Sequence, residues 1–503
     1  MHFLLLSTLG LAILASASLD AQASSSQEQA TQFALLLRET NQRANKYGYP
    51  LVPYAQLAVP ILRDGVSNKF QHTRDLPIPD KKLADFPPVD TLSSTVIIDL
   101  AATDIIVDIP SMSDRFWVFS FYDVYGDNYA NLGVVGGSSA GKYRVAYRPA
   151  NPGTGPGGVL DGYKGWVYSP TPYGVLVARL QLKDNGSDVD AIHQLQDKMV
   201  VTKPALGNIQ VAPTLSVELL NSGLSGDPNL ASLQLTCRLS SFNPPNQASD
   251  VAWVSSVLRL AGCSHGQFNK GNQVDLPTMA EQANATMEKL AQNSQKLIDL
   301  KNGWQIFQSQ MQGKYASNYV IRAYFAHSNY LAMDTKQALY PVYSDGNKDL
   351  SLGLYQAYLL TFSSKPPKGA SGFWSLTTYG FNFDLIANPL NQFSLGSSSK
   401  LTYPDGTPVY GGSDTKDGKF QILVQSPFHK IPSNWTSNWL PGPAGGGVVY
   451  LALRFYAPTS ALSDGSWSYP VVEKVNVITG SSLSSNVAGN QQQVLDQSRG
   501  AEL

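Results

Sequence analysis

Aspartates in the N-terminal half are the first residues of this chain whose type and spacing could support chemistry. Asp90 stands in the segment Pro-Val-Asp-Thr-Leu, and Asp99 ends the apolar run that follows it. A pair of carboxylates can act as general acid and general base on a glycoside or an ester. With His72, they are the candidate catalytic residues. The alternative, which we favour, is that acidic residues at strand ends form turns and salt bridges. Further aspartates in the same region include Asp104, Asp108, Asp123 and Asp127.

A second candidate group lies in the C-terminal half, where asparagine and tryptophan stand close together. Asparagine amides form hydrogen bonds and tryptophan rings stack on apolar faces, which suits the recognition of a sugar or polyol. The same residues also suit loop anchoring in a β-sandwich, and this structural interpretation is slightly favoured. The candidate substrate-binding residues are Thr91, Trp374, Asn391, Asn438, Trp439 and Arg454.

We place the candidate site where the Asp90–Thr91 loop meets this C-terminal group. Arg454 interrupts the otherwise apolar segment 448–456. A buried arginine needs a carboxylate partner or a bound anion, and Asp90 or Asp99 is the expected partner. The favoured alternative is a structural Arg–Asp pair that locks two domains together.

Signatures of familiar catalytic and cofactor sites are mostly absent from the sequence. It contains no His-Glu-x-x-His, no complete phosphate-binding loop and no Cys-x-x-Cys. Segment 137–141 has the letters of a hydrolase nucleophile elbow, but a strand pattern follows where that motif needs a helix. Segment 153–158 has dinucleotide-binding glycine spacing, but a proline interrupts it. We interpret both as glycine-rich turns. The histidines are scattered, so we predict no metal site and no cofactor.

The elements that must position these residues are mostly short strands. β-Branched and aromatic runs separated by Gly, Pro and Asp recur in both halves, which is typical of strands. Between them, an apolar stripe at helical spacing predicts a helix from Asp275 to Gly303. A helix over 27–46 is expected to stop at Gly48 and Pro50. We therefore expect a mainly β fold with these parts: an N-terminal β-sandwich-like domain (45–186), a helical connecting region (187–335), a C-terminal jelly-roll-like domain (336–475) and a tail (476–503).

The first residues predict export. A short apolar run, followed by small residues, is typical of a secretory signal peptide, here residues 1–23. The alternative is a buried N-terminal helix. The run is too short for a stable membrane anchor, and no later segment is long enough. Three sequons agree with an extracellular location, and they predict glycosylation at Asn185, Asn284 and Asn434.

The net charge bears on the possible binding partners, and the cysteine content bears on a possible disulfide. Lys+Arg is 36 and Asp+Glu is 37, a formal net charge of −1, so no global field attracts nucleic acid or an anionic membrane. Cys237 and Cys263 are the only cysteines. An oxidising compartment favours a disulfide between them, and two separate buried thiols are an equal alternative. The sequence predicts no oligomeric state.

Ordered motifs in both halves resemble known families. In the C-terminal half they are Phe373-Trp-Ser-Leu-Thr, Asn388-Pro-Leu-Asn391, Tyr403-Pro-Asp-Gly, Asn438-Trp-Leu-Pro441, Leu453-Arg454-x-Tyr456 and Asp464-Gly-x-Trp467. This segment resembles the family known as domain of unknown function 1214. The N-terminal half, with Tyr47-Gly-Tyr-Pro50, Val89-Asp90-Thr91-Leu92 and Arg115-Phe116, resembles domain of unknown function 1254. Pro88 and Ser93 stand where that family usually has Asn and Tyr.

The resemblance implies an architecture, an N-terminal sandwich-like domain joined through helices to a jelly-roll-like domain, and it supplies no catalytic residues. Two hypotheses about function remain. The first is an enzyme acting on a small extracellular or secondary-metabolite substrate in a cleft between the two β domains. The second is a non-catalytic secreted protein that binds a glycan or a small amphiphile. If Asp90, Asp99 or His72 converges on the C-terminal Asn/Trp group, the enzyme is favoured.

Overall fold

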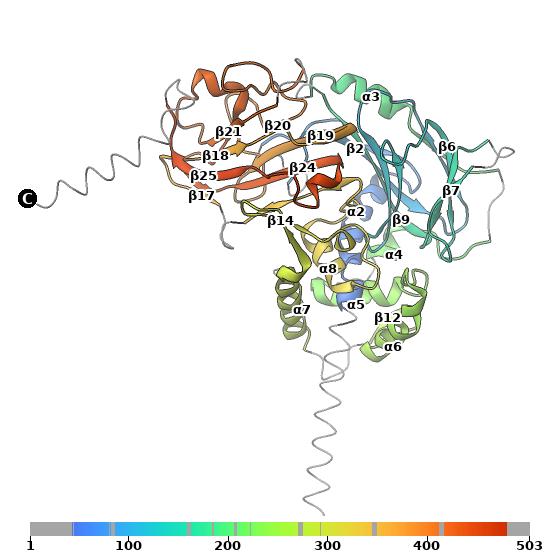
Figure 1. The fold of residues 1–503 in the computed structure, drawn as a ribbon. Helices are drawn as coiled ribbons and strands as arrows, with labels where there is room; N and C mark the ends of the chain where they lie inside the picture. The colour runs from blue at the N-terminus through green and yellow to red at the C-terminus, as the bar shows by residue number, and fades with distance from the viewer. Residues whose placement is uncertain are drawn as a thin grey trace, which may run out of the picture.

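The computed structural model describes residues 43, 45–79, 81, 86–157, 162–183, 186–205, 209–221, 223–269, 275–291, 293–344, 350–411 and 417–479. The expected signal peptide, Asn185 and most of the C-terminal tail lie outside them. The fold is mainly β with a helical middle, as the sequence predicts (Figure 1). No helix in the described ranges has the length and apolar character needed to cross a membrane.

The N-terminal half contains two five-stranded sheets. Across the first sheet the strands are β1 (Gln71–His72), β2 (Thr91–Asp99), β9 (Tyr173–Gln181), β4 (Trp117–Asp123) and β5 (Asn128–Gly133). Across the second they are β10 (Val200–Thr202), β3 (Ile105–Ile109), β6 (Gly141–Tyr147), β8 (Gly165–Ser169) and β7 (Gly153–Pro156).

Successive side chains of β2 point to opposite faces of the first sheet, and this alternation explains how the N-terminal half is packed. Val96 and Ile98 join the core that the two sheets share, whereas Ile97 points to the other face of the first sheet and joins a core formed with helices. Those helices are α2 (Leu51–Asp64), α4 (Val217–Asn221) and α5 (Pro228–Leu239) (Figure 1). Because both faces of the first sheet are covered, all of β4 is buried.

The helix break expected at Gly48 and Pro50 is present. The helical residues end at Gly48, and a second helix, α2, begins directly after Pro50. A proline at a helix N-terminus has no hydrogen bond to lose, and its fixed φ suits the first turn. Few helical residues before Pro50 can be compared with the expected helix over 27–46, because the described residues begin at 43.

The middle region supplies the remaining helices: α3 (Val189–Asp197), α6 (Val251–Ala261), α7 (Leu276–Ala291) and α8 (Tyr319–Ser328). The helix expected from Asp275 begins as predicted, with the Asp275 carboxylate accepting the backbone N–H of Thr278. It ends at Ala291 rather than at Gly303. Residues 297–299 form β13 (Leu297–Asp299), which pairs with β14 (Trp304–Phe307), and Gly303 belongs to the tight turn between them, with φ of +80°.

The middle region also contains the disulfide. Cys237 of α5 is bonded to Cys263 of the short strand β11 (Cys263–Ser264), and their Cα atoms are 5.0 Å apart. The bridge ties the end of α6 to α5, beneath the first sheet.

The C-terminal half is built on two four-stranded sheets. The first has the order β15 (Ala338–Leu339), β24 (Tyr450–Pro458), β19 (Lys368–Tyr379) and β20 (Ser394–Gly396). The second has the order β22 (Trp439–Pro441), β21 (Phe420–Gln425), β18 (Gln356–Phe362) and β25 (Val471–Asn476). A core with Trp374, Leu453 and Ile422 fills the space between them.

The two halves are joined by a continuous apolar contact. Phe116, next to β4, packs against Phe373 of β19 and Tyr456 of β24, with ring centroids 5.7 and 5.4 Å away. The rings of Phe373 and Tyr456 are themselves stacked, 4.3 Å apart and nearly parallel. Since these aromatic groups are buried together, the first N-terminal sheet and the β19–β24 pair form one junction.

Candidate functional site

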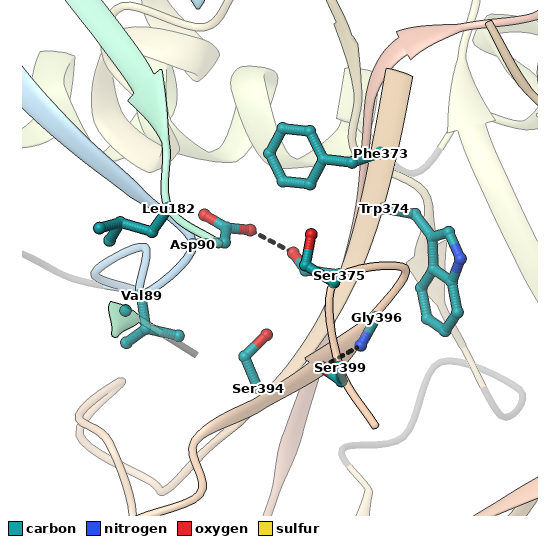
Figure 2. Close-up of a pocket in the computed structure, with 11 residues that line it drawn as sticks. Val89, Asp90, Leu182, Phe373, Trp374, Ser375, Ser394, Gly396 and Ser399 are labelled. Atoms are coloured by element: carbon teal, nitrogen blue, oxygen red, sulfur yellow. Dashed lines mark hydrogen bonds between the residues drawn. The ribbon is translucent and has the colours of Figure 1, made fainter. Parts of the chain in front are cut away.

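The junction brings Asp90 to the C-terminal half. Asp90 is buried immediately before β2, and its carboxylate accepts a hydrogen bond from the Ser375 hydroxyl of β19 (Figure 2). The other carboxylate oxygen accepts a hydrogen bond from the Tyr456 hydroxyl over 3.4 Å. The predicted meeting of the Asp90 loop with the C-terminal half is therefore present, through residues 375 and 456 rather than through the Asn/Trp group.

A small polar pocket opens beside this contact. Its lining residues include Val89, Leu182, Phe373, Trp374 and four serines (Ser375, Ser394, Ser398, Ser399). The volume is about 30 Å³. Since one water needs roughly 10–15 Å³ of such space, the pocket has room for about two waters or one hydroxyl-bearing group.

Arg454 is buried in β24, as the sequence predicts, but it does not pair directly with a carboxylate. Its guanidinium donates to the Tyr379 hydroxyl and to the Phe86 carbonyl, both over 3.0 Å, and it contacts the Thr377 hydroxyl at 3.4 Å. The expectation of a direct Asp90 or Asp99 partner is wrong. Burial alone lowers the pKa of Arg454, but Tyr379, Tyr456 and Asp90 outweigh this effect and raise it. Arg454 thus fastens the segment before Asp90 to β24.

Asp99 and His72 lie away from this junction. Asp99 ends β2, so its Cα is roughly 30 Å from that of Asp90 along an extended strand. Its carboxylate accepts the backbone N–H groups of Ala101 and Leu215, both over 2.9 Å. His72 bonds to Ser94 over 2.8 Å, and burial lowers its pKa. Because neither residue lines the pocket, the carboxylate pair proposed for acid–base chemistry does not form.

Most of the C-terminal Asn/Trp group has structural contacts. Asn438 accepts from the Thr402 backbone N–H and donates to the carbonyls of Thr402 and Gln421, over 2.7–2.9 Å. Trp439 is fully buried in a separate apolar cluster, and Asn391 is exposed in a turn with φ of +49°. Of the six predicted binding residues, Trp374 is the one that lines the pocket, while its indole N–H donates to the Tyr410 hydroxyl.

Thr91 and the sequons complete the predicted set. Thr91 is buried beside Asp90, and its hydroxyl has no hydrogen-bond partner among the described residues. Asn284 is exposed on α7, whereas Asn434 is half-buried and lines a second small pocket of about 10 Å³.

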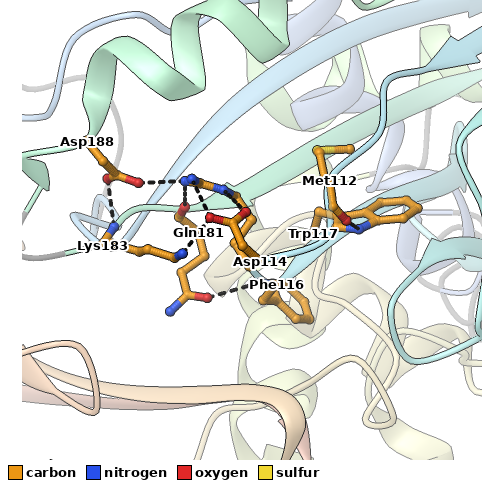
Figure 3. A network of polar contacts seen from close by, with 8 residues as sticks. Met112, Asp114, Phe116, Trp117, Gln181, Lys183 and Asp188 are labelled. Carbon is orange, nitrogen blue, oxygen red and sulfur yellow. Dashed lines mark hydrogen bonds and ion pairs between the residues drawn. The ribbon is translucent and has the colours of Figure 1, made fainter. Parts of the chain in front are cut away.

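An ion-pair network flanks the pocket on the N-terminal side (Figure 3). Arg115 is bonded to Asp188 over 2.6 Å and to Asp114 over 3.2 Å, and Lys183 also bonds to Asp114 over 2.6 Å. The Gln181 amide links this network to the pocket, because it accepts the Phe116 N–H and donates to the Ser398 hydroxyl, both over 3.0 Å.

Sequence reasoning missed Arg179, which lies within the apolar strand β9. Its guanidinium contacts the Tyr122 hydroxyl at 3.4 Å and the Leu331 carbonyl at 3.5 Å. Arg454 was singled out because it is an arginine inside an apolar strand, and the sequence around Arg179 has the same pattern. Tyr340, which interacts electrostatically with Arg179, Arg454 and Asp90, carried no signal of its own.

Sequence reasoning also did not predict that a second set of charged and aromatic side chains is buried together. Arg322 of α8 is bonded to Asp127 at 3.4 Å and is surrounded by the rings of Tyr47, Tyr125 and Tyr319, 4.3–5.0 Å from its guanidinium carbon. Asp123 lies beside Asp127 in the same group. Burial and Asp127 raise the pKa of Asp123 to about 7. Sequence reasoning named both aspartates but not the arginine, which stands in a helix far away in the sequence.

Metal ligands do not gather in the parts of the chain that the structure describes: no three side chains of His, Cys, Asp or Glu there could hold an ion together. The arrangement at the pocket supports hydrogen bonding to a polar group, and Asp90 can accept a proton or a hydroxyl hydrogen bond there.

Comparison with known proteins finds one family match in each half of the chain. No curated protein sequence matches it significantly. A crystal structure of the VPA0106 protein from Vibrio parahaemolyticus has a TM-score of 0.61 at 18% identity, covering 88% of this chain and 100% of that one, so the two share a fold. A putative uncharacterized protein from Burkholderia cenocepacia has a TM-score of 0.39 at 11% identity, covering 90% and 97%. Residues 67–203 match the model of the family described as "Protein of unknown function (DUF1254)", and residues 337–460 match that of "Protein of unknown function (DUF1214)".

Proposed function

We propose that this protein binds a small hydroxylated molecule, such as a sugar or polyol, at the junction of its two β halves. The observation that carries the proposal is the pocket beside Asp90, which is lined by serine hydroxyls from β19 and β20 and from the loop after β20. A carboxylate and hydroxyls that share a small recess suit hydrogen bonding to another hydroxyl group.

The size of the pocket defines how such a ligand binds. About 30 Å³ admits one hydroxyl-bearing group and not a whole sugar ring. The ligand therefore inserts one group next to Asp90, and the rest of it lies against the surrounding surface. In doing so it displaces about two waters, whose hydrogen bonds the inserted hydroxyl reproduces.

A catalytic role is the second candidate, and the Asp90–Ser375 hydrogen bond favours it. A buried carboxylate that accepts the proton of a hydroxyl can act as a general base toward Ser375 or toward a ligand hydroxyl in its place. Asp90 alone would then perform the acid–base role first assigned to a pair, since Asp99 and His72 lie elsewhere.

Export remains part of the proposal. The apolar run near the N-terminus, the sequons and the disulfide between Cys237 and Cys263 support a secreted glycoprotein. Among the sequons in the described ranges, Asn284 is the better acceptor because it is exposed. N-terminal sequencing of secreted protein tests this: a first residue near Ser18 or Ser24 is expected, and an intact Met1 on cytosolic protein contradicts it.

Ligand-observed NMR with a mixture of sugars and polyols tests binding. Saturation transfer to at least one compound is expected for the unmodified protein, with its loss in Asp90→Asn. Asp64→Asn, an exposed aspartate at the end of α2, is the matched control and retains the signal. If Asp90→Asn folds normally and binds every compound as before, the pocket is not the site.

A further inference from the structure

Arg179 has an incompletely satisfied guanidinium at the same junction. Its two hydrogen bonds, to Tyr122 and to the Leu331 carbonyl, are 3.4 and 3.5 Å long, at the limit of such contacts. Within the described ranges no carboxylate oxygen lies within 4 Å of it. A guanidinium has five N–H donors in a rigid fork that matches a carboxylate. Arg179 therefore keeps most of its hydrogen-bonding capacity available.

The groups around Arg179 leave an excess of positive charge. Two guanidinium groups, Arg179 and Arg454, share this region with one carboxylate, Asp90, and all three interact electrostatically with Tyr340. The tyrosines are neutral donors at ordinary pH, because burial raises the pKa of Tyr340 to about 12 and also raises the pKa of Tyr456. The net charge of these three groups is +1, which one monoanion neutralises.

Arg179 and Tyr340 are nevertheless within reach of a ligand. Both are only partly buried. In the described part of the chain the Tyr340 hydroxyl has no hydrogen-bond partner, although it lies among charged groups. Two hydrogen-bonding side chains with unused donors therefore keep accessible surface at the domain junction.

Strand geometry places Arg179 next to the pocket. Arg179 and Gln181 are two residues apart on β9, so their side chains lie on the same face of the sheet, with Cα atoms roughly 7 Å apart. Gln181 donates to Ser398, which lines the pocket. Tyr456 of the C-terminal half lies near both Arg179 and the pocket, since its hydroxyl donates to Asp90 and it interacts electrostatically with Arg179.

The carbonyl that faces Arg179 belongs to a strained residue. Leu331 has a φ of +63°, in the left-handed region that a branched side chain rarely adopts. Such strain persists only where surrounding structure enforces it, and it is found frequently at binding sites. Here it holds the 331 carbonyl toward Arg179.

We propose that Arg179, assisted by the Tyr340 hydroxyl, binds the carboxylate of the ligand whose hydroxyl group occupies the Asp90 pocket. This inference rests on the proposed function and narrows it. The ligand is then a small hydroxylated carboxylic acid rather than a neutral polyol. Its carboxylate faces Arg179 on β9, and its hydroxyl faces Asp90 and Ser375.

Three related probes separate the two parts of the site: glycerate, glycerol and propionate. Glycerate has both groups, glycerol lacks the carboxylate and propionate lacks the hydroxyls. Dissociation constants from ligand-observed NMR are expected to be lowest for glycerate, by about tenfold or more over either analogue, because charge-assisted hydrogen bonds are the stronger ones. Arg179→Met should remove the advantage of glycerate over glycerol, and Tyr340→Phe should reduce it.

Controls keep the outcomes distinct. Arg63→Met, which removes an exposed arginine of α2, should leave all three affinities unchanged, and Arg179→Lys keeps the charge if Arg179→Met does not fold. If glycerol binds as tightly as glycerate and still depends on Asp90, the anion site is wrong and the proposed function stands. If propionate equals glycerate and depends on Arg179, the hydroxyl pocket is wrong. If no probe binds, both are overturned.

Discussion

The backbone N–H of Asp127 donates to the carboxylate of Asp123 over 3.0 Å, which places two buried acidic side chains beside one arginine, Arg322. The Tyr125 N–H and the Asn246 amide also donate to Asp123, over 2.8 and 2.9 Å. One guanidinium neutralises one carboxylate, so the second carboxyl group is more stable when it carries a proton. This group joins β4, α8 and the residues before α2 into one unit.

The raised pKa of Asp123 predicts how stability depends on pH. A carboxyl group near pKa 4 in the unfolded chain and about 7 in the folded one binds more protons when folded. Its contribution is complete below about pH 4 and is lost as the pH rises through about 7. Urea unfolding should therefore show a loss on the order of 2 kcal/mol from pH 5 to pH 8 that Asp123→Asn lacks.

The exposed substitution Asp64→Asn controls for this pH series and should behave as the unmodified protein. The Asn246 side chain accommodates both protonation states of Asp123, since its amide can donate in one orientation and accept in the other. A parallel pH dependence in the unmodified protein and in Asp123→Asn would show that Asp123 does not titrate in this range.

The disulfide should contribute measurably to stability. The bridge between Cys237 and Cys263 closes a loop with a sequence separation of 26, and loops of this size stabilise by about 3 kcal/mol through the unfolded chain. Replacing both cysteines by serine should lower the free energy of unfolding by about that amount. Thiol titration of the unfolded, unreduced protein should find no free thiols, and two free thiols would contradict the bridge.

The network in Figure 3 predicts a contrast between two basic residues that share Asp114. Arg115 is buried, and Arg115→Met leaves the Asp188 carboxylate without its guanidinium, so we expect a loss of about 3 kcal/mol. Lys183 is half-exposed, and Lys183→Met should cost below about 1 kcal/mol. Chemical denaturation measures both. Equal losses of unfolding free energy for the two variants would mean that burial of the basic residue does not determine how much it stabilises the protein.

The sequence predicted the architecture because strand and helix patterns are local. Alternation and β-branched runs indicated the strands around Thr95 and Phe116, and the Asp275 cap indicated α7. Its end was misjudged, since the pairing of Leu297 with Phe307 is a tertiary contact that competes with helix propensity. The helix break at Gly48 and Pro50 was predicted, but the start of α2 directly after it was not, since a proline has the same local signature at the end of one helix and at the start of the next.

The candidate site was predictable only in part. Asp90 and the domain junction followed from the order of the motifs, but the partners of each polar residue depend on long-range packing. The Asp99 carboxylate is satisfied by the Leu215 N–H, 116 residues away, and Asn438 by two backbone carbonyls. No pattern in the sequence shows which buried polar groups are already satisfied. Arg179 was overlooked although its setting in β9 is that of Arg454 in β24.

Arg454 allows the last prediction, which separates a lock from a ligand-binding residue. Arg454→Met leaves the Phe86 carbonyl and the Tyr379 hydroxyl without their donor in a buried setting, and each such group costs about 1–3 kcal/mol. Denaturation should show a loss of about 2–4 kcal/mol, with Arg63→Met unchanged. The variant that folds should still bind glycerate, because Arg454 does not line the pocket. Unchanged stability together with lost binding would assign Arg454 to the ligand instead, and would transfer to it the role that Arg179 has in the anion site.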